Sequence, residues 1–171
     1  MKNLVFMMDI DIKGDGRYDS SRRAAYKYSI DSWKRWCDKN DSELFVLNEL
    51  LLDNSEMGVC WQRYYLFDIL DVNEIEYNQI LMVDADTIVH PDCPNFFDMS
   101  EGKLCAAQFD GSWDWVLRGI ENYSKYIFDG FMMPWYNYFD CGFIIVNDKH
   151  REFFKIITDL YLTYKDNLTI L

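Results

Sequence analysis

Short runs of uninterrupted apolar residues alternate along this chain with longer segments that have helical periodicity. The runs predict strands at residues 3–8, 44–47, 79–83, 104–107 and 142–146. A strand that is apolar on both sides must be covered on both faces, as happens when βαβ units build a parallel sheet. The pattern therefore predicts an α/β, Rossmann-like fold with a mainly parallel central sheet flanked by helices.

Three segments have the spacing of amphipathic or buried helices. The first begins at Ser20 or Ser21, after a polar loop over residues 9–19, and has its apolar positions at Tyr26, Ile30, Trp33 and Cys37. The second, over residues 59–70, is apolar on most sides and is expected to be well buried. The third follows the last strand, and its expected buried face consists of Phe153, Ile156, Ile157, Leu160 and Tyr164.

The composition is that of one globular domain. No linker, repeat or low-complexity segment interrupts the 171 residues, so a single domain over residues 1–171 is expected. The chain has 29 acidic and 17 basic side chains and a formal charge of −12. A nucleic-acid-binding protein contacts phosphates with clustered Lys and Arg, so this charge argues against that class. Most of the acidity is Asp, which is common in turns, helix caps and sites for hard metal ions.

The N-terminal apolar run is stopped by Asp9 and is shorter than the 7–15 apolar residues of a signal peptide. No run approaches the roughly 20 apolar residues of a membrane span. The five cysteines lie far apart without a CxxC pair, which fits neither a disulfide framework nor a zinc site. We expect reduced, mostly buried thiols in a cytoplasmic protein without a membrane span.

Carboxylates follow the predicted strands at the edge of the sheet where ligands bind in this fold class. Those expected to gather there are Asp9, Asp84, Asp86 and Asp110. Asp84 and Asp86 directly follow the apolar run that ends at Val83, and in extended backbone both would point to the same side. They would repel unless a cation lay between them, and Mg²⁺ or Mn²⁺ suits oxygen ligands and the bridging of a diphosphate. The pair therefore indicates a metal site whose ion would neutralise charge on a leaving nucleoside diphosphate.

Three ordered segments carry a resemblance to a known family. Residues 77–89, YNQILMVDADTIV, followed by Pro91 and Phe96-Phe97, resemble the metal-binding segment of GT-A-fold, DxD-containing nucleotide-sugar glycosyltransferases, and are most similar to glycosyltransferase family 8. Residues 61–70, WQRYYLFDIL, and 138–147, YFDCGFIIVN, resemble the helix before the metal strand and the later strand that lines the sugar site. The resemblance implies a hexosyltransferase-like enzyme. It would move a sugar from a nucleoside-diphosphate sugar, with UDP favoured, to a hydroxyl of a glycan or another acceptor.

The resemblance also implies roles for individual residues. Asp86 would bind Mn²⁺ or Mg²⁺ directly, and Asp84 would bind the metal or the hydroxyls of the ribose and the sugar. Met8 and Asp9 would lie against the base and ribose of the nucleotide. Arg63 would lie near the diphosphate or the sugar, and Asp140 would contact the donor sugar in the catalytic site.

The chain departs from the family at its C-terminal end. Many family 8 members bind the metal with a third residue, a His in a C-terminal segment, and this chain stops at Leu171 without that segment. Its two histidines, His90 and His150, lie elsewhere, and a surface or capping role is expected for both. Two interpretations stay open: the sequence is the N-terminal part of a longer protein, or it is a minimal enzyme with water as further metal ligands.

An aromatic-rich stretch between Cys105 and Asp140 is a candidate acceptor-binding region, because aromatic faces stack against the C–H surfaces of sugars. Asp110 and Asp114 are expected in one loop of this stretch. If the enzyme inverts the anomeric centre, one of them would be the general base that deprotonates the acceptor hydroxyl. A retaining enzyme needs no such base, and the resemblance favours retention.

Two other functions stay open. A nucleotidyltransferase that makes nucleotide sugars usually has a Gly-rich, basic N-terminal loop, whereas here Lys13 and Arg17 are balanced by four aspartates within residues 9–19. A non-catalytic nucleotide-sugar-binding module would bind the donor without turnover. The donor sugar, the nucleobase, the acceptor, the stereochemistry and the oligomeric state are left open by the sequence.

Overall fold

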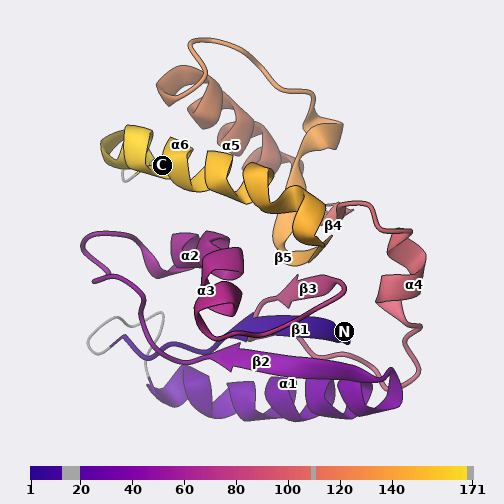
Figure 1. Cartoon of the computed structure of the whole chain (residues 1–171). Helices are drawn as coiled ribbons and strands as arrows, with labels where there is room; N and C mark the ends of the chain where they lie inside the picture. The colour runs from indigo at the N-terminus through magenta and orange to yellow at the C-terminus, as the bar shows by residue number, and fades with distance from the viewer. Residues whose placement is uncertain (13–19, 109–110, 169–171) are drawn as a thin grey trace.

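A computed structural model describes residues 1–12, 20–108 and 111–168. Within these ranges five strands form one sheet in the order β2-β1-β3-β5-β4 (Figure 1). The strands are β1 (Asn3–Met8), β2 (Ser42–Leu47), β3 (Ile80–Val83), β4 (Cys105–Gln108) and β5 (Phe139–Val146). β1 pairs in parallel with β2 and β3, whereas β5 runs antiparallel to both of its neighbours, β3 and β4. The predicted α/β fold with a mainly parallel sheet is confirmed.

Helices connect the strands in the order that the sequence predicts, with additions. They are α1 (Ser20–Lys39), α2 (Val59–Gln62), α3 (Leu66–Val72), α4 (Phe96–Ser100), α5 (Trp113–Tyr126) and α6 (Arg151–Leu168). Three 3₁₀ turns are η1 (Arg63–Tyr65), η2 (Trp135–Asn137) and η3 (Asp148–His150). The helix predicted over residues 59–70 is thus divided by η1. The sequence did not predict α4 or α5.

The sheet is covered on both faces, as the apolar runs predict. Alternate residues of β1 point to opposite sides of the sheet. Leu4 and Phe6 belong to a core cluster with α3 and α6, whereas Val5 and Met7 belong to a second cluster with α1 and α4. Figure 1 shows α1 along one side of the sheet, with α3 and α6 on the other. The helices packed on the two faces hold the sheet in place, and with it the strand ends, where the candidate site lies.

The buried face of α6 differs from the predicted one. The structure buries Phe154, Thr158 and Tyr161, whereas Phe153 and Ile156 of the predicted face are 38% and 54% exposed. Because α6 carries apolar residues on more than one side, helical periodicity alone does not identify the side that meets the core. The contacts at the start of the helix fix its rotation.

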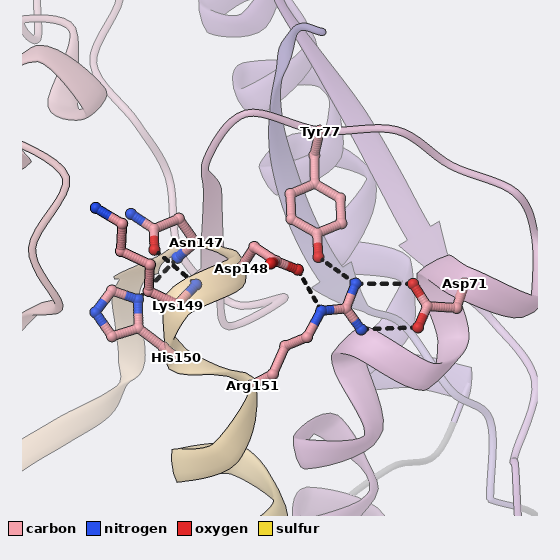
Figure 2. Close-up of polar contacts among 7 residues, drawn as sticks. All are labelled: Asp71, Tyr77, Asn147, Asp148, Lys149, His150 and Arg151. Atoms are coloured by element: carbon pink, nitrogen blue, oxygen red, sulfur yellow. Dashed lines mark hydrogen bonds and ion pairs between the residues drawn. The ribbon is translucent and has the colours of Figure 1, made fainter.

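Figure 2 shows these contacts, which anchor α6 to the rest of the molecule. The Arg151 guanidinium makes a bidentate ion pair with Asp71 of α3, at 2.7 and 2.8 Å, and also donates to the hydroxyl of Tyr77 at 2.8 Å. Its Nε donates to Asp148. His150 Nδ1 accepts a hydrogen bond from the backbone N–H of Asn147 at 3.0 Å, which completes a capping box. The capping role predicted for His150 is confirmed.

All five cysteines lie within the described residues and are thiols, as predicted. Only Cys37 is buried; Cys60 is exposed and the other three are half-buried, so the prediction of mostly buried thiols is wrong. His90 is exposed, which agrees with its predicted surface role. In the described part of the chain, no helix has both the length and the apolar character needed to cross a membrane.

Candidate functional site

The reversal of β5 brings its first residues to the edge of the sheet where β1 and β3 end. Val83 at the end of β3 is paired with Phe143, and the backbone N–H of Asp84 donates to the carbonyl of Gly142 at 3.1 Å. Asp140, the second residue of β5, therefore lies at the same edge as Asp84, because β5 runs antiparallel to β3. Strand ends alone would not have predicted this position, because an all-parallel sheet puts strand starts at the opposite edge.

Asp84 is held by Arg63, whose side chain is only 15% exposed. Nη1 of Arg63, from the turn η1, lies 2.7 Å from Asp84 Oδ1 and also donates to the carbonyl of Cys141 at 3.1 Å. Burial would lower the pKa of Arg63, but the Asp84 carboxylate outweighs this effect and the net pKa is raised. Nε of Arg63 is buried and has no hydrogen-bond partner among the described residues. A fixed carboxylate and an unpaired donor thus lie together at this edge.

Gly142 lets the Asp84 side chain pack directly against β5. A Cβ at this glycine would lie 2.5 Å from Asp84 Oδ2, which is closer than real Cβ contacts. The backbone N–H of Gly142 also donates to Asp140 Oδ1 at 2.6 Å. This role of Gly142 was not predicted from the sequence, although an isolated glycine in an apolar strand is a known signal of such a close approach.

Residues 84–87 form a turn. The backbone N–H and the Oγ1 of Thr87 both donate to the carbonyl of Asp84, at 3.2 and 2.7 Å, and Trp33 Nε1 donates to Thr87 Oγ1 at 3.0 Å. The expectation that extended backbone aligns Asp84 and Asp86 is therefore wrong: β3 ends at Val83 and the chain turns at once. Asp86 is exposed, and its side chain makes no ion pair or hydrogen bond with the described residues.

The end of β1 carries a second acidic pair. Arg23 of α1 contacts Asp9 at 2.7 Å and Asp11 at 3.3 Å, so one arginine offsets both carboxylates. The hydrogen bond from Arg23 to Asp9 raises the pKa of the arginine. Met8, the last residue of β1, is half-buried and lies at the same edge as Asp9. Since β1 and β3 are neighbours, Asp9 and Asp84 of the expected set lie at this edge, together with Asp140 from β5. Asp86 follows in the turn after β3, and Asp110 lies outside the described residues.

The structure describes only one of the two aspartates named as a candidate general base. Asp110 lies outside the described residues. Asp114 is in the first turn of α5 and not in a loop, because the Oγ of Ser112 caps the helix by accepting from the N–H of Trp115 at 3.2 Å. Asp114 forms an exposed i, i+4 ion pair with Arg118 at 3.1 Å.

The carboxylates at this edge of the sheet fit a metal ion that arrives bound to its substrate. In residues 1–12, 20–108 and 111–168, no group of three His, Cys, Asp or Glu side chains is placed to hold a metal. Mg²⁺ in particular is often bound by only one or two carboxylates, with substrate phosphates and water as the remaining ligands. Asp86 is the accessible carboxylate, and Asp84 is positioned by Arg63 and Gly142. The two can supply that smaller set.

Neither a protein-family model nor a curated protein sequence matches this chain. A similar solved structure is the crystal structure of a glycosyltransferase involved in the glycosylation of the major capsid of PBCV-1. The superposition has a TM-score of 0.61 and 10% sequence identity, and it covers 94% of this chain and 67% of that chain. The likeness is one of fold. This chain therefore has a fold that a glycosyltransferase also uses.

Proposed function

We propose that this chain is a metal-dependent glycosyltransferase. It would move a sugar from a nucleoside-diphosphate sugar, with a UDP-sugar favoured, to a hydroxyl of a glycan or another acceptor. The observation that carries the proposal is the pair of carboxylates after β3, with Asp84 fixed by Arg63 and Gly142 and Asp86 exposed to solvent. The fold shared with a glycosyltransferase supports the same reaction class.

Asp86, with Asp84 beside it, is assigned to Mn²⁺ or Mg²⁺. When bound, that ion would supply Lewis-acid stabilisation of the negative charge on the departing diphosphate. Arg63 holds Asp84 in place, and its own guanidinium brings a positive charge to the same edge of the sheet. Its unpaired Nε–H is the donor we assign to a diphosphate oxygen, because a buried donor without a partner is costly unless a ligand satisfies it.

The remaining predicted residues surround this centre. Asp140 is assigned to the donor sugar: its Oδ1 accepts from the N–H of Gly142, which orients the carboxylate at the start of β5. Met8 and Asp9, at the end of the neighbouring strand, are assigned to the base and ribose. Catalysis would then rest on positioning the donor and on electrostatic stabilisation of the leaving group. The GT-A fold and the likeness to family 8 belong to the same proposal.

A second candidate function is a non-catalytic nucleotide-sugar-binding module. Among the described residues no group of three candidate ligands is placed to hold a metal, and binding of a donor without turnover would not need one. The nucleotidyltransferase alternative requires a basic loop for the incoming nucleotide. The described acidic residues at the end of β1 are instead offset by Arg23 of α1.

The test is release of nucleoside diphosphate with Mn²⁺ from UDP-glucose, UDP-galactose, UDP-N-acetylglucosamine and GDP-mannose. We expect release from at least one donor and a loss of about 100-fold in Asp86→Asn, equivalent to about 2.7 kcal/mol of transition-state stabilisation. The matched control is Asp92→Asn. Asp92 lies in the segment that follows Asp86, and its exposed carboxylate is paired with Lys39. Binding of a donor without release would favour the module. Formation of a nucleotide sugar from a sugar phosphate and a nucleoside triphosphate would favour the nucleotidyltransferase.

A further inference from the structure

A cavity of about 400 Å³ lies beside the start of β5, and none of Asp9, Asp84, Asp86 and Asp140 lines it. One wall is α5, and the others include Trp61 of α2 and Tyr138, which immediately precedes β5. Its volume falls within the 300–1,000 Å³ that is usual for small-molecule sites. A larger cavity of about 700 Å³ lies along β2 and α3, and its lining is mainly aliphatic, with Phe45 and Tyr65 as its aromatic residues. It therefore offers less aromatic surface for a sugar than the cavity beside α5.

The cavity is joined to the carboxylate edge by a short stretch of chain. Tyr138 lines it, and Asp140 lies two residues further on, at the edge. Cys141 accepts a hydrogen bond on its Sγ from Tyr64 at 3.1 Å and on its carbonyl from Arg63 at 3.1 Å. The chain that follows Tyr138 is therefore bonded, three residues further on, to the arginine that holds Asp84.

The shape of the cavity depends on a glycine of α5. A Cβ at Gly119 would lie 2.9 Å from the hydroxyl oxygen of Tyr138, so the absence of a side chain lets this tyrosine lie against the helix. Burial raises the pKa of both Tyr123 and Tyr138, which keeps their hydroxyls protonated and able to donate at neutral pH. Two phenol donors thus accompany the aromatic rings.

The lining combines ring faces with polar groups whose charges cancel. Trp61, Trp115, Tyr123 and Tyr138 supply aromatic surface, and Trp115 is 65% exposed. Asp114 and Arg118 form an ion pair with each other, and Asn122 adds a neutral amide. A ring of hydroxyls with apolar C–H faces and no net charge matches this set, since aromatic faces and a few polar groups then fix its orientation. An anionic sugar would find no unbalanced cation among these residues.

We propose that this cavity is the acceptor site and that it takes a neutral pyranoside. The proposal rests on the proposed function, because it gives that reaction its acceptor class. The acceptor would bind against α5 and reach the donor past Tyr138 and the first residues of β5.

The binding test uses the whole chain and ligand-observed NMR titrations with the methyl glycosides of glucose, galactose, mannose and N-acetylglucosamine. We expect at least one to bind with a Kd on the order of 1 mM, as for a ligand of this size. Trp115→Ala and Asn122→Ala should each weaken it at least about 10-fold. Trp113→Ala is the matched control, because Trp113 lies on the same helix and makes an edge-to-face contact with Trp135 instead of lining the cavity. Absence of binding by all four glycosides, or equal weakening by Trp113→Ala, would overturn the proposal.

A charged competitor tests the acceptor class. Methyl glucuronide and glucose 6-phosphate should bind no more tightly than the neutral glycosides, and tighter binding of either would contradict the assignment. Release of nucleoside diphosphate from the donor, measured without acceptor, separates the acceptor site from the proposed function. Release that is unchanged in Trp115→Ala, together with an acceptor KM raised about 10-fold, supports the acceptor site. Release without any glycoside binding removes the acceptor site alone, whereas glycoside binding without release from any donor removes the proposed function.

Discussion

The tryptophans of α1 and of α5 have opposite environments. Trp33 and Trp36 of α1 are 2% and 0% exposed and pack against the sheet and α4, where the ring of Trp36 stacks on Phe96 at 5.1 Å. Trp113 and Trp115 of α5 are 58% and 65% exposed. The difference teaches that α1 is part of the scaffold, whereas α5 leaves aromatic surface exposed, and Trp115 of this surface lines the proposed acceptor cavity. Aromatic content alone does not distinguish these two uses.

The largest expected effect concerns the scaffold. Trp36→Ala should lower the free energy of unfolding by about 3–5 kcal/mol, because it removes a fully buried ring and leaves a cavity. Trp113→Ala should cost less than about 1 kcal/mol, since much of its ring is already in solvent. Urea denaturation of both variants measures the contrast. Similar losses in the two variants would mean that α5 is as much a part of the core as α1.

The next largest effect is expected at two glycines, each of which lets a side chain from another element lie against its backbone. Gly142→Ala should displace Asp84 and reduce donor release about 100-fold, or about 2.7 kcal/mol, because the new Cβ would lie 2.5 Å from its Oδ2. Gly119→Ala should leave donor release within about twofold and raise the acceptor KM, because its Cβ meets the hydroxyl of Tyr138. Steady-state kinetics separates them, and an equal loss of donor release in both would contradict two distinct sites.

A smaller effect concerns the anchor of α6. Arg151 lowers the pKa of Asp71 chiefly through the hydrogen bonds between them. A carboxyl with a lowered folded-state pKa stabilises the protein above its unfolded value of about 3.9, and that contribution is lost as the pH falls through the folded pKa. Arg151→Leu should therefore lower the Tm at pH 7, and its difference from the unmodified chain should shrink below about pH 4. A difference that stays constant with pH would assign the anchor to packing on Phe67 instead.

The smallest effect is chemical. Burial, as the main cause, raises the pKa of Cys37 on α1 to about 12, so almost none of it is thiolate at pH 8. Cys60 on α2 is exposed. Iodoacetamide should label Cys60 first and leave Cys37 unmodified in the folded protein, as mass spectrometry of the peptides would show. Labelling of Cys37 at a similar rate would mean that the α1 layer opens readily.

Much of the fold could be predicted because its strands are buried on both faces. The run over residues 3–8 coincides with β1, β3 is one residue shorter than the run over residues 79–83, and β5 extends the run over residues 142–146 at its start. The direction of β5 could not be predicted, since an apolar strand carries no sign of its polarity. The rotation of α6 was also missed, because it depends on Arg151 reaching Asp71 from 80 residues away.

The candidate site, like the fold, has parts that could be predicted from the sequence and parts that could not. Asp84 and Asp140 were named from the strand pattern and the resemblance, and the structure places both at one edge, joined through Gly142. The turn at residues 84–87 was missed because it depends on Thr87 bonding back to Asp84 and on Trp33 of another element. The loop expected around Asp114 is a helix, since the apolar positions Val116 and Ile120 and the Ser112 cap outweigh the turn-forming residues.

The most direct test of the central claim is the binding of UDP and GDP with and without Mn²⁺, measured by calorimetry. We expect one of them to bind at least about 10-fold more tightly with Mn²⁺, or about 1.4 kcal/mol. Asp86→Asn should abolish this gain, and Asp92→Asn should retain it. The same gain in Asp86→Asn, or no gain in the unmodified chain, would contradict a metal and diphosphate site at the end of β3.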